Sequence, residues 1–348
     1  MLFQLYGSTA MTQLLGWVLV FAGLVILNEI GRRTKIGGIV LFVIIPAVLT
    51  IYFITIQAGL FGGHSNQTYE YMNGWFHYAK LYAADIGVVG FLMIKYKWGI
   101  GKKEWFKPWP FVIVAINILI AVVSDFESAI RAYQITGDFS GAWWASNEGV
   151  FLYGGWWNIV NGIAGLINIF CMTGWWGIYS SKKKDDMLWP DMTIWFIVAY
   201  DIWNFEYTYC NLPTHTWYCG VALLLAPTFA NAFWNKGGWI QNRANTLALW
   251  CMFAQVFPLF QDKSRFSVLT SVYADGYMDP TVPPTNADPT MQGIIAIIAL
   301  VANVCVFASI IKRAKEQKKN PYKNEIFTDQ KDYKLALERA AEKARKAA

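Results

Sequence analysis

Two carboxylates interrupt stretches of the sequence that are otherwise apolar enough to lie in a lipid bilayer. Asp85 lies in LYAADIGVVG, and Asp201 lies in IVAYDIWNFEYTYC. A central aspartate adds about 2.5–3.5 kcal/mol to the cost of inserting a helix into a membrane, so such residues are normally functional or paired. Intramembrane carboxylates of this kind carry protons in pumps and coupled carriers. The two residues therefore predict a proton pathway.

Polar side chains accompany each carboxylate on its helix face. With 3.6 residues per turn, Tyr82 shares a face with Asp85, and Asn204 shares a face with Asp201. Glu206 lies about 140° round the helix from Asp201 and nearer the predicted outer end. We expect these side chains to line part of a polar path.

Lys80 is a basic residue that lies well inside a predicted span. It could form a buried ion pair with Asp201 or Glu206, which would neutralise charge without any transport. Alternatively, the carboxylates bind and release protons while Lys80 lines the same path. The sequence leaves both interpretations open.

Three asparagines form a second polar face in GGWWNIVNGIAGLINIFCMTGWW, residues 154–176. Asn158, Asn161 and Asn168, which we call the Asn stripe, lie on one side of a helix, with Gly165 between them to open space. An unpartnered amide in hydrocarbon costs several kcal/mol, so these side chains must meet other helices or water. Amides at helix contacts contribute about 0.6 kcal/mol each on average. The Asn stripe predicts either such a contact or the lining of a polar cavity.

Asn231 follows Pro227 in LLLAPTFANAFWNKGG. Proline removes a backbone hydrogen bond, and broken helices near the membrane midplane recur at solute and ion sites. A simple packing kink is the alternative. We include Asn231 among the residues expected to line the cavity.

Membrane-spanning helices must position these residues. The sequence is 55% hydrophobic and 17% aromatic, with a mean hydropathy of +0.31, outside the usual range of soluble proteins. Apolar runs of roughly 17–25 residues, enough for about 30 Å of hydrocarbon, predict the spans. They lie near 11–30, 37–57, 75–95, 109–125, 153–177, 192–211, 216–234, 244–260 and 291–311. The sequence thus predicts an all-α polytopic integral membrane protein with about nine transmembrane helices, eight being the alternative.

The basic residues predict the side of the membrane on which each loop lies. Most of the 29 Lys and Arg residues fall on one side when the N-terminus is placed outside, as expected for cytoplasmic loops. The C-terminus is then cytoplasmic, and the chain divides into a transmembrane helical domain at 1–311 and a cytoplasmic basic tail at 312–348. We expect a multi-pass protein of the plasma membrane. The net charge of +6 suits an anionic inner leaflet and does not indicate nucleic acid.

The sequence does not indicate a metal or a cofactor. It contains no phosphate-binding P-loop and no HExxH zinc motif, and the last predicted span has no lysine for a retinal Schiff base. The five cysteines and three histidines lack the spacing of metal ligands. Cys210 and Cys219 flank NLPTHTWY, where a disulfide and two free thiols are equally compatible with the spacing.

Together these patterns predict a secondary transporter of a small polar or aromatic solute, proton-coupled through Asp85 or Asp201. The first alternative is a non-transporting sensor or assembly scaffold whose buried polar groups pair with one another. The second is an intramembrane enzyme that uses the two carboxylates as acid and base. A carrier requires a hydrated cavity that contains the Asn stripe and a carboxylate. A cavity that does not reach Asn161 would argue against transport.

Overall fold

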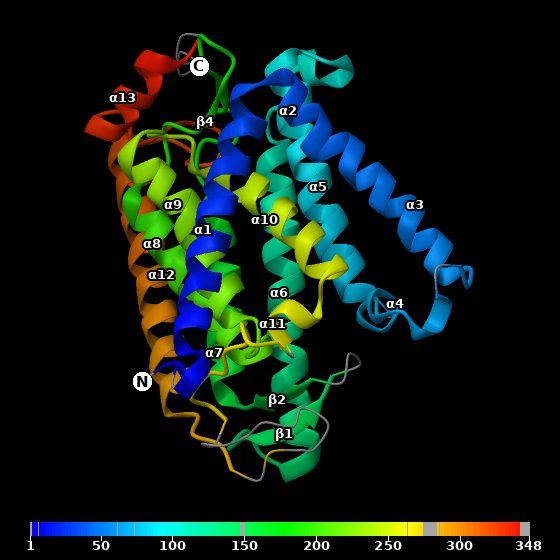
Figure 1. The fold of residues 1–348 in the computed structure, drawn as a ribbon. Coiled ribbons are helices and arrows are strands. Elements are labelled where there is room, and N and C mark those ends of the chain that lie inside the picture. The colour runs from blue at the N-terminus through cyan, green and yellow to red at the C-terminus, as the bar shows by residue number, and fades with distance from the viewer. Residues whose placement is uncertain are drawn as a thin grey trace.

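The computed structural model describes residues 2–341 apart from 6, 61, 73, 147–149, 263, 274–283 and 285. The described chain is mostly helical (Figure 1). The long helices are α1 Ala10–Arg33, α5 Trp75–Tyr96, α6 Trp109–Thr136, α7 Trp156–Phe170, α8 Ile194–Asn211, α10 Trp239–Val256 and α12 Thr290–Gln317. The shorter helices are α4 Gln67–Tyr71, α11 Leu259–Asp262 and α13 Lys331–Arg339, with 3-10 turns at Gly7–Thr9, Gly63–Ser65, Gly99–Lys102 and Glu104–Phe106.

Two further helical segments contain a π-helical turn. One joins α2 Lys35–Ile39, the π turn Val40–Ile44 and α3 Ile45–Gln57. The other joins the π turn η6, Thr216–Ala222, to α9 Leu223–Phe233. The strands form two short antiparallel hairpins, β1 Ala142–Ala145 with β2 Phe151–Gly154, and β3 Tyr179–Ser180 with β4 Met187–Leu188.

Within the described residues, five helical segments are long and apolar enough to cross a membrane. They are Gly7–Arg33, Lys35–Gln57, Glu104–Thr136, Thr216–Phe233 and Thr290–Gln317. The predicted spans at 75–95, 153–177, 192–211 and 244–260 contain α5, α7, α8 and α10, which fall short of that length or hydropathy. Most side chains of α8 and α10 are buried by other helices, so these two do not need an apolar surface.

The helices pack in two groups around a shared interior (Figure 1). Helices α6, α7, α8 and α12 form one group, with Trp203 and Phe111 in its core. Helices α1, α5, α9 and α10 form the other, with Leu81 and Leu249 in its core. Helix α3 diverges from the bundle and leaves Ile51 exposed, which suits contact with lipid. The boundary between the two groups is where the pocket described below lies.

The residues that follow α12 pack back onto the bundle. Asp191 accepts hydrogen bonds at Oδ1 from the backbone N–H groups of Ile326 (2.8 Å) and Phe327 (2.7 Å). Asp186, which is fully buried, forms ion pairs with Arg32 of α1 and Arg339 of α13. The predicted tail therefore begins inside α12, which ends at Gln317, and its described part is docked. Residues 342–348 of the predicted tail lie outside the described residues.

Candidate functional site

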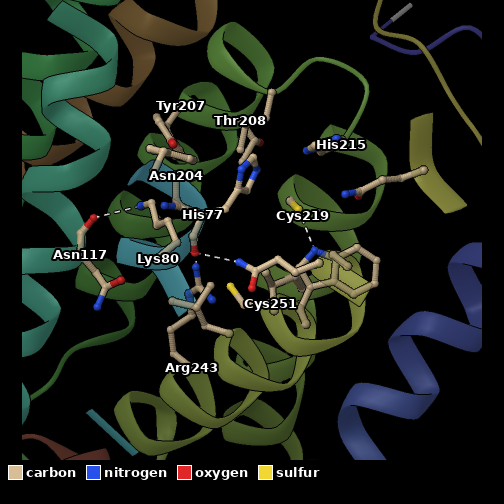
Figure 2. A pocket seen from close by; sticks show the side chains of 18 of the residues that line it. His77, Lys80, Asn117, Asn204, Tyr207, Thr208, His215, Cys219, Arg243 and Cys251 are labelled. Carbon is tan, nitrogen blue, oxygen red and sulfur yellow. Dashed lines mark hydrogen bonds between the residues drawn. The ribbon is translucent and has the colours of Figure 1, made fainter. Parts of the chain in front are cut away.

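A pocket of about 80 Å³ lies between the two helix groups (Figure 2). Helix α8 lines it lengthwise with Tyr200, Asn204, Tyr207 and Thr208, because residues three, four, seven and eight apart share one helix face. The other lining residues come from α4, α5, α6, η6, α9, α10, α11 and the short α8–η6 connection. They are Tyr71, Phe76, His77, Lys80, Asn117, Leu212, His215, Cys219, Leu223, Arg243, Leu247, Trp250, Cys251, Ala254, Gln255 and Gln261.

Two basic side chains face the pocket. Lys80 Nζ donates a hydrogen bond to the backbone oxygen of Asn117 at 3.2 Å and lies 5.1 Å from the ring centroid of Tyr207. The Arg243 side chain, 6% exposed, donates from Nη2 to Asn204 Oδ1 at 3.4 Å and lies 5.7 Å from the ring centroid of Tyr200. Arg243 Nε and Nη1 are buried without a hydrogen-bond partner among the described residues.

The rest of the lining combines aromatic rings with thiols. Trp250 stacks on Tyr218 behind the pocket wall and donates from Nε1 to Cys219 Sγ at 2.9 Å. Gln255 donates from Nε2 to the backbone oxygen of His77 at 2.8 Å, which ties α10 to the start of α5. Ring faces beside amide and hydroxyl groups are typical of sites for small organic molecules.

A histidine–aspartate pair stands at one end of the pocket. His215 Nε2 lies 2.7 Å from Asp262 Oδ1, which also accepts a hydrogen bond from the Thr214 hydroxyl at 2.7 Å. Burial raises the pKa of Asp262, but His215 and the hydrogen bonds lower it by more, so that pKa lies below its usual value. Asp262 is therefore a carboxylate at neutral pH, and it pins the short connection between α8 and η6 to α11.

The Asn stripe does not line this pocket. Asn161 donates to Asp125 Oδ2 at 2.9 Å, and Asn158 donates to Asp125 Oδ1 at 3.2 Å. Asn168 donates to Asn303 of α12 at 2.7 Å. All the residues that donate or accept in these contacts are buried. This arrangement fits the interpretation of the Asn stripe as a contact between helices, not as a cavity lining. Gly165, expected to open space, instead admits the Trp203 ring, whose Nε1 would lie 2.5 Å from an added Cβ.

Asp125 is the centre of this buried cluster. Asn211 of α8 also donates to Asp125 Oδ1, at 2.5 Å, and accepts a hydrogen bond from the Ser128 hydroxyl. Three amides from α7 and α8 thus converge on one fully buried carboxylate of α6. Such a network fixes the relative positions of three helices.

Two of the predicted site residues, Lys80 and Asn204, line the pocket. The predicted ion pair of Lys80 with Asp201 or Glu206 is not formed in the described structure. Asp201 instead accepts a hydrogen bond from Thr228 at 2.7 Å, and its Oδ1 is buried without a partner.

The remaining predicted residues lie elsewhere. Tyr82 shares a hydrogen bond of 2.8 Å with Thr50, between α3 and α5. The thiol of Cys210 donates to Glu206 at 2.9 Å, and Asn231 accepts from the backbone N–H of Gly237 at 3.0 Å. Asp85 Oδ1 is buried without a partner, and Asp85 does not line the pocket.

Sequence reasoning missed several residues that make the site. Arg243 was assigned to a cytoplasmic loop, but α10 begins at Trp239 and carries it into the pocket. Asp125 was placed at the end of a span, but α6 continues to Thr136, so the carboxylate lies inside the helix. His77 and His215, whose spacing in the sequence indicated no site, both line the pocket. The sequence did place Thr208 on the same helix face as Asn204, and both residues line the pocket.

Cys210 and Cys219 are free thiols that contact different partners. Cys210 is bonded to Glu206, whereas Cys219 accepts from Trp250, and the structure contains no bridge between them. We expect denatured protein to react with the same number of maleimide groups before and after reduction, counted by intact mass. A gain of two thiols on reduction would contradict the structure.

The fold and the pocket define a mostly helical protein with an internal polar pocket and, in the part of the chain that the structure describes, five helical segments long and apolar enough to cross a membrane. The chain belongs to DUF5692, a family of unknown function, whose model matches residues 7–339. The match covers both helix groups, the pocket and the docked tail. Comparison with curated proteins and with solved structures gives no match.

Proposed function

We propose that this protein is a membrane-embedded binding protein for a small solute, which it holds in the pocket between α5, α8 and α10. The observation that carries the proposal is the lining itself, in which Lys80, Arg243 and Asn204 face the same space as aromatic rings. Pockets with a few polar groups among aromatic walls are the usual form of small-molecule sites. Asp85 and Asp201 are not among the described residues that line the pocket, so an enzyme that uses these two carboxylates as acid and base finds no support in it.

The proposal places nine helical segments across a plasma membrane, with the N-terminus outside and the tail in the cytoplasm. Its support is the agreement between the nine predicted spans and the positions of the long helices. In addition, α1 begins at the end of the bundle opposite α13, as an odd number of crossings requires (Figure 1). The exposed apolar residues of α1, α3 and α12 supply a lipid-facing surface.

Pocket filling provides the test. Leu247 lines the pocket, and Leu247→Trp should occupy it. Val304 of α12 is 45% exposed, so Val304→Trp is the matched control on the outer surface. We expect at least one of benzoate, benzamide, benzyl alcohol and benzylamine to raise the melting temperature of the detergent-purified protein, because a ligand at 100 Kd stabilises the native state by about 2.7 kcal/mol.

Leu247→Trp should remove that shift, and Val304→Trp should keep it. If no solute of this set produces a shift that depends on Leu247, the pocket is not a binding site and the proposal fails.

Transport of the bound solute is a second candidate, and the π turn η6 favours it. Cys219 of η6 and Leu223 of α9 line the pocket, and Pro227 interrupts the same segment. Interrupted helices beside a site recur in alternating-access carriers. Because the pocket does not reach Asn161, the expectation that tied transport to the Asn stripe is not met, and this candidate depends on the pocket alone.

Vesicle measurements test transport separately from binding. If the protein is a proton-coupled carrier, sealed vesicles should accumulate the bound solute along a pH gradient. Asp201→Asn should then abolish accumulation but preserve solute exchange, because exchange needs no net proton transfer. Binding without either movement would leave a sensor, and unchanged accumulation by Asp201→Asn would exclude coupling through that residue.

A further inference from the structure

The charge distribution in the pocket is one-sided. Lys80 reaches it from the second turn of α5 and Arg243 from the second turn of α10, so two different helices direct cations into one space (Figure 2). Arg243 is more than nine-tenths buried. The Arg243 side chain stays buried although it lies near the start of α10, whereas long basic side chains near helix ends normally reach water.

The neighbouring carboxylates do not neutralise these cations by contact. Asp125 and Asp201 are the carboxylates whose charges reach Lys80 and Arg243, respectively. Asp125 is occupied by the three amides of its cluster, and Asp201 accepts from Thr228. No ion pair joins Lys80 or Arg243 to any carboxylate in the described part of the chain.

Hydrogen-bond donors are in excess at the same place. A guanidinium has five N–H donors and an ammonium has three. Arg243 uses one of its donors, for a long bond of 3.4 Å to Asn204, and Lys80 uses one for the Asn117 carbonyl. Arg243 Nε and Nη1 have no protein acceptor within the described residues. Buried donors without acceptors are costly, and a planar oxyanion satisfies a guanidinium edge with two parallel bonds.

Aromatic faces restrict what such an anion can be. Tyr200 and Tyr207 lie beside the two cations, and Phe76 and Trp250 complete an apolar wall. A cavity of about 80 Å³ admits only a compact molecule. Inorganic anions would leave the aromatic wall unused.

We propose that the pocket selects a small organic carboxylate, with the carboxylate held between Lys80 and Arg243 and the apolar body against Tyr200, Tyr207 and Trp250. This inference rests on the proposed solute-binding function and adds the chemical class of the solute. It differs from the expectation from sequence, in which carboxylates of the protein would supply the charge.

Four probes of nearly equal size separate charge from shape. Benzoate is anionic, benzamide and benzyl alcohol are neutral, and benzylamine is cationic. We expect benzoate to bind at least tenfold more tightly than the other three, measured by isothermal titration calorimetry and by the shift in melting temperature. Inorganic phosphate should compete with benzoate weakly, because it lacks the apolar body.

Variants of the two cations identify the source of the selectivity. Arg243→Gln and Lys80→Gln should each weaken benzoate binding at least tenfold and leave benzamide binding within about twofold, because only the anion forms charge-assisted bonds. Arg243→Lys keeps the charge but loses the planar fork, so we expect an intermediate loss. Lys102→Gln removes an exposed cation of the 3-10 turn at 99–102 and serves as the matched control, with benzoate binding unchanged.

Each outcome has a distinct meaning. Equal binding of benzoate and benzamide, or preference for benzylamine, overturns the anion inference but leaves solute binding in place. Failure of all four probes in a protein whose Leu247→Trp variant behaves identically overturns the proposed function itself. If Arg243→Gln does not fold, Lys80→Gln and Arg243→Lys decide the question, and normal benzoate selectivity in both of them rejects the inference.

Discussion

Asp125→Leu is expected to lower the stability of the protein on the order of 3–6 kcal/mol, because three buried amides donate to this carboxylate and each donor left unpaired costs about 1–3 kcal/mol. The sum stays below its maximum because Asn158 and Asn211 keep weaker acceptors, Asn211 Oδ1 at 3.5 Å and the Tyr207 backbone oxygen at 3.3 Å. Asn158, Asn161 and Asn211 all donate to this carboxylate, and all are buried. Leucine has as many side-chain heavy atoms as aspartate, with two methyl groups in place of the two carboxylate oxygens, so the loss would come from the missing acceptor more than from a cavity. Unfolding by denaturant in detergent micelles measures it.

Asp125→Asn is the matched control for shape. Its carbonyl oxygen still accepts hydrogen bonds, but its new amide group meets other amide donors, so we expect a smaller loss than with leucine. Asn161→Leu removes one donor and leaves Asp125 with two, and its loss should also be smaller. Full stability of Asp125→Leu would show that the cluster does not hold the helices together.

Asp186→Ala should cost about 3–5 kcal/mol, the range for breaking one side of a buried ion pair. Asp186 is fully buried and pairs with both Arg32, which is 2% exposed, and Arg339. Glu29 also pairs with Arg32 at 2.6 Å, which would limit the loss. Because Arg339 belongs to α13, the tail should become accessible to protease in the variant. Melting temperature and limited proteolysis of the tail measure the two effects.

An exposed pair provides the control for that experiment. Asp329 pairs with Arg313 on the surface, and Asp329 is 65% exposed. Surface ion pairs contribute at most about 1 kcal/mol, so Asp329→Ala should have little effect on melting temperature. Equal effects of Asp186→Ala and Asp329→Ala would contradict a structural role for the buried pair.

Helix positions were predictable from the sequence because apolar length is a local property. Each predicted span contains a helix, including 192–211 and 244–260, whose helices α8 and α10 carry many polar residues. Helix ends were less predictable. The helix expected at 109–125 continues to Thr136. Asp125 therefore lies within the helix and not at its end, which is why the sequence did not mark it as a buried carboxylate.

The partners of the polar residues were not predictable, because they depend on contacts between distant segments. The periodicity of the Asn stripe correctly indicated a polar face, but that face meets Asp125 and Asn303, not a cavity. Arg243 lies one residue before the span predicted at 244–260, so the sequence indicated a basic residue of a loop. Only side-chain contacts between α10 and α8 place it beside Asn204 and Tyr200.

The docked tail has a consequence for biogenesis. Asp191 lies just before α8, but it finds the backbone of Ile326 and Phe327 only after more than a hundred further residues have been synthesised. Asp186 acquires its second partner, Arg339, still later in synthesis. A nascent chain that has not yet reached these residues thus exposes an incompletely paired acidic segment. A chain shortened before Arg339 would keep that segment open, so recognition of the segment by quality-control proteases would depend on the docking of α13.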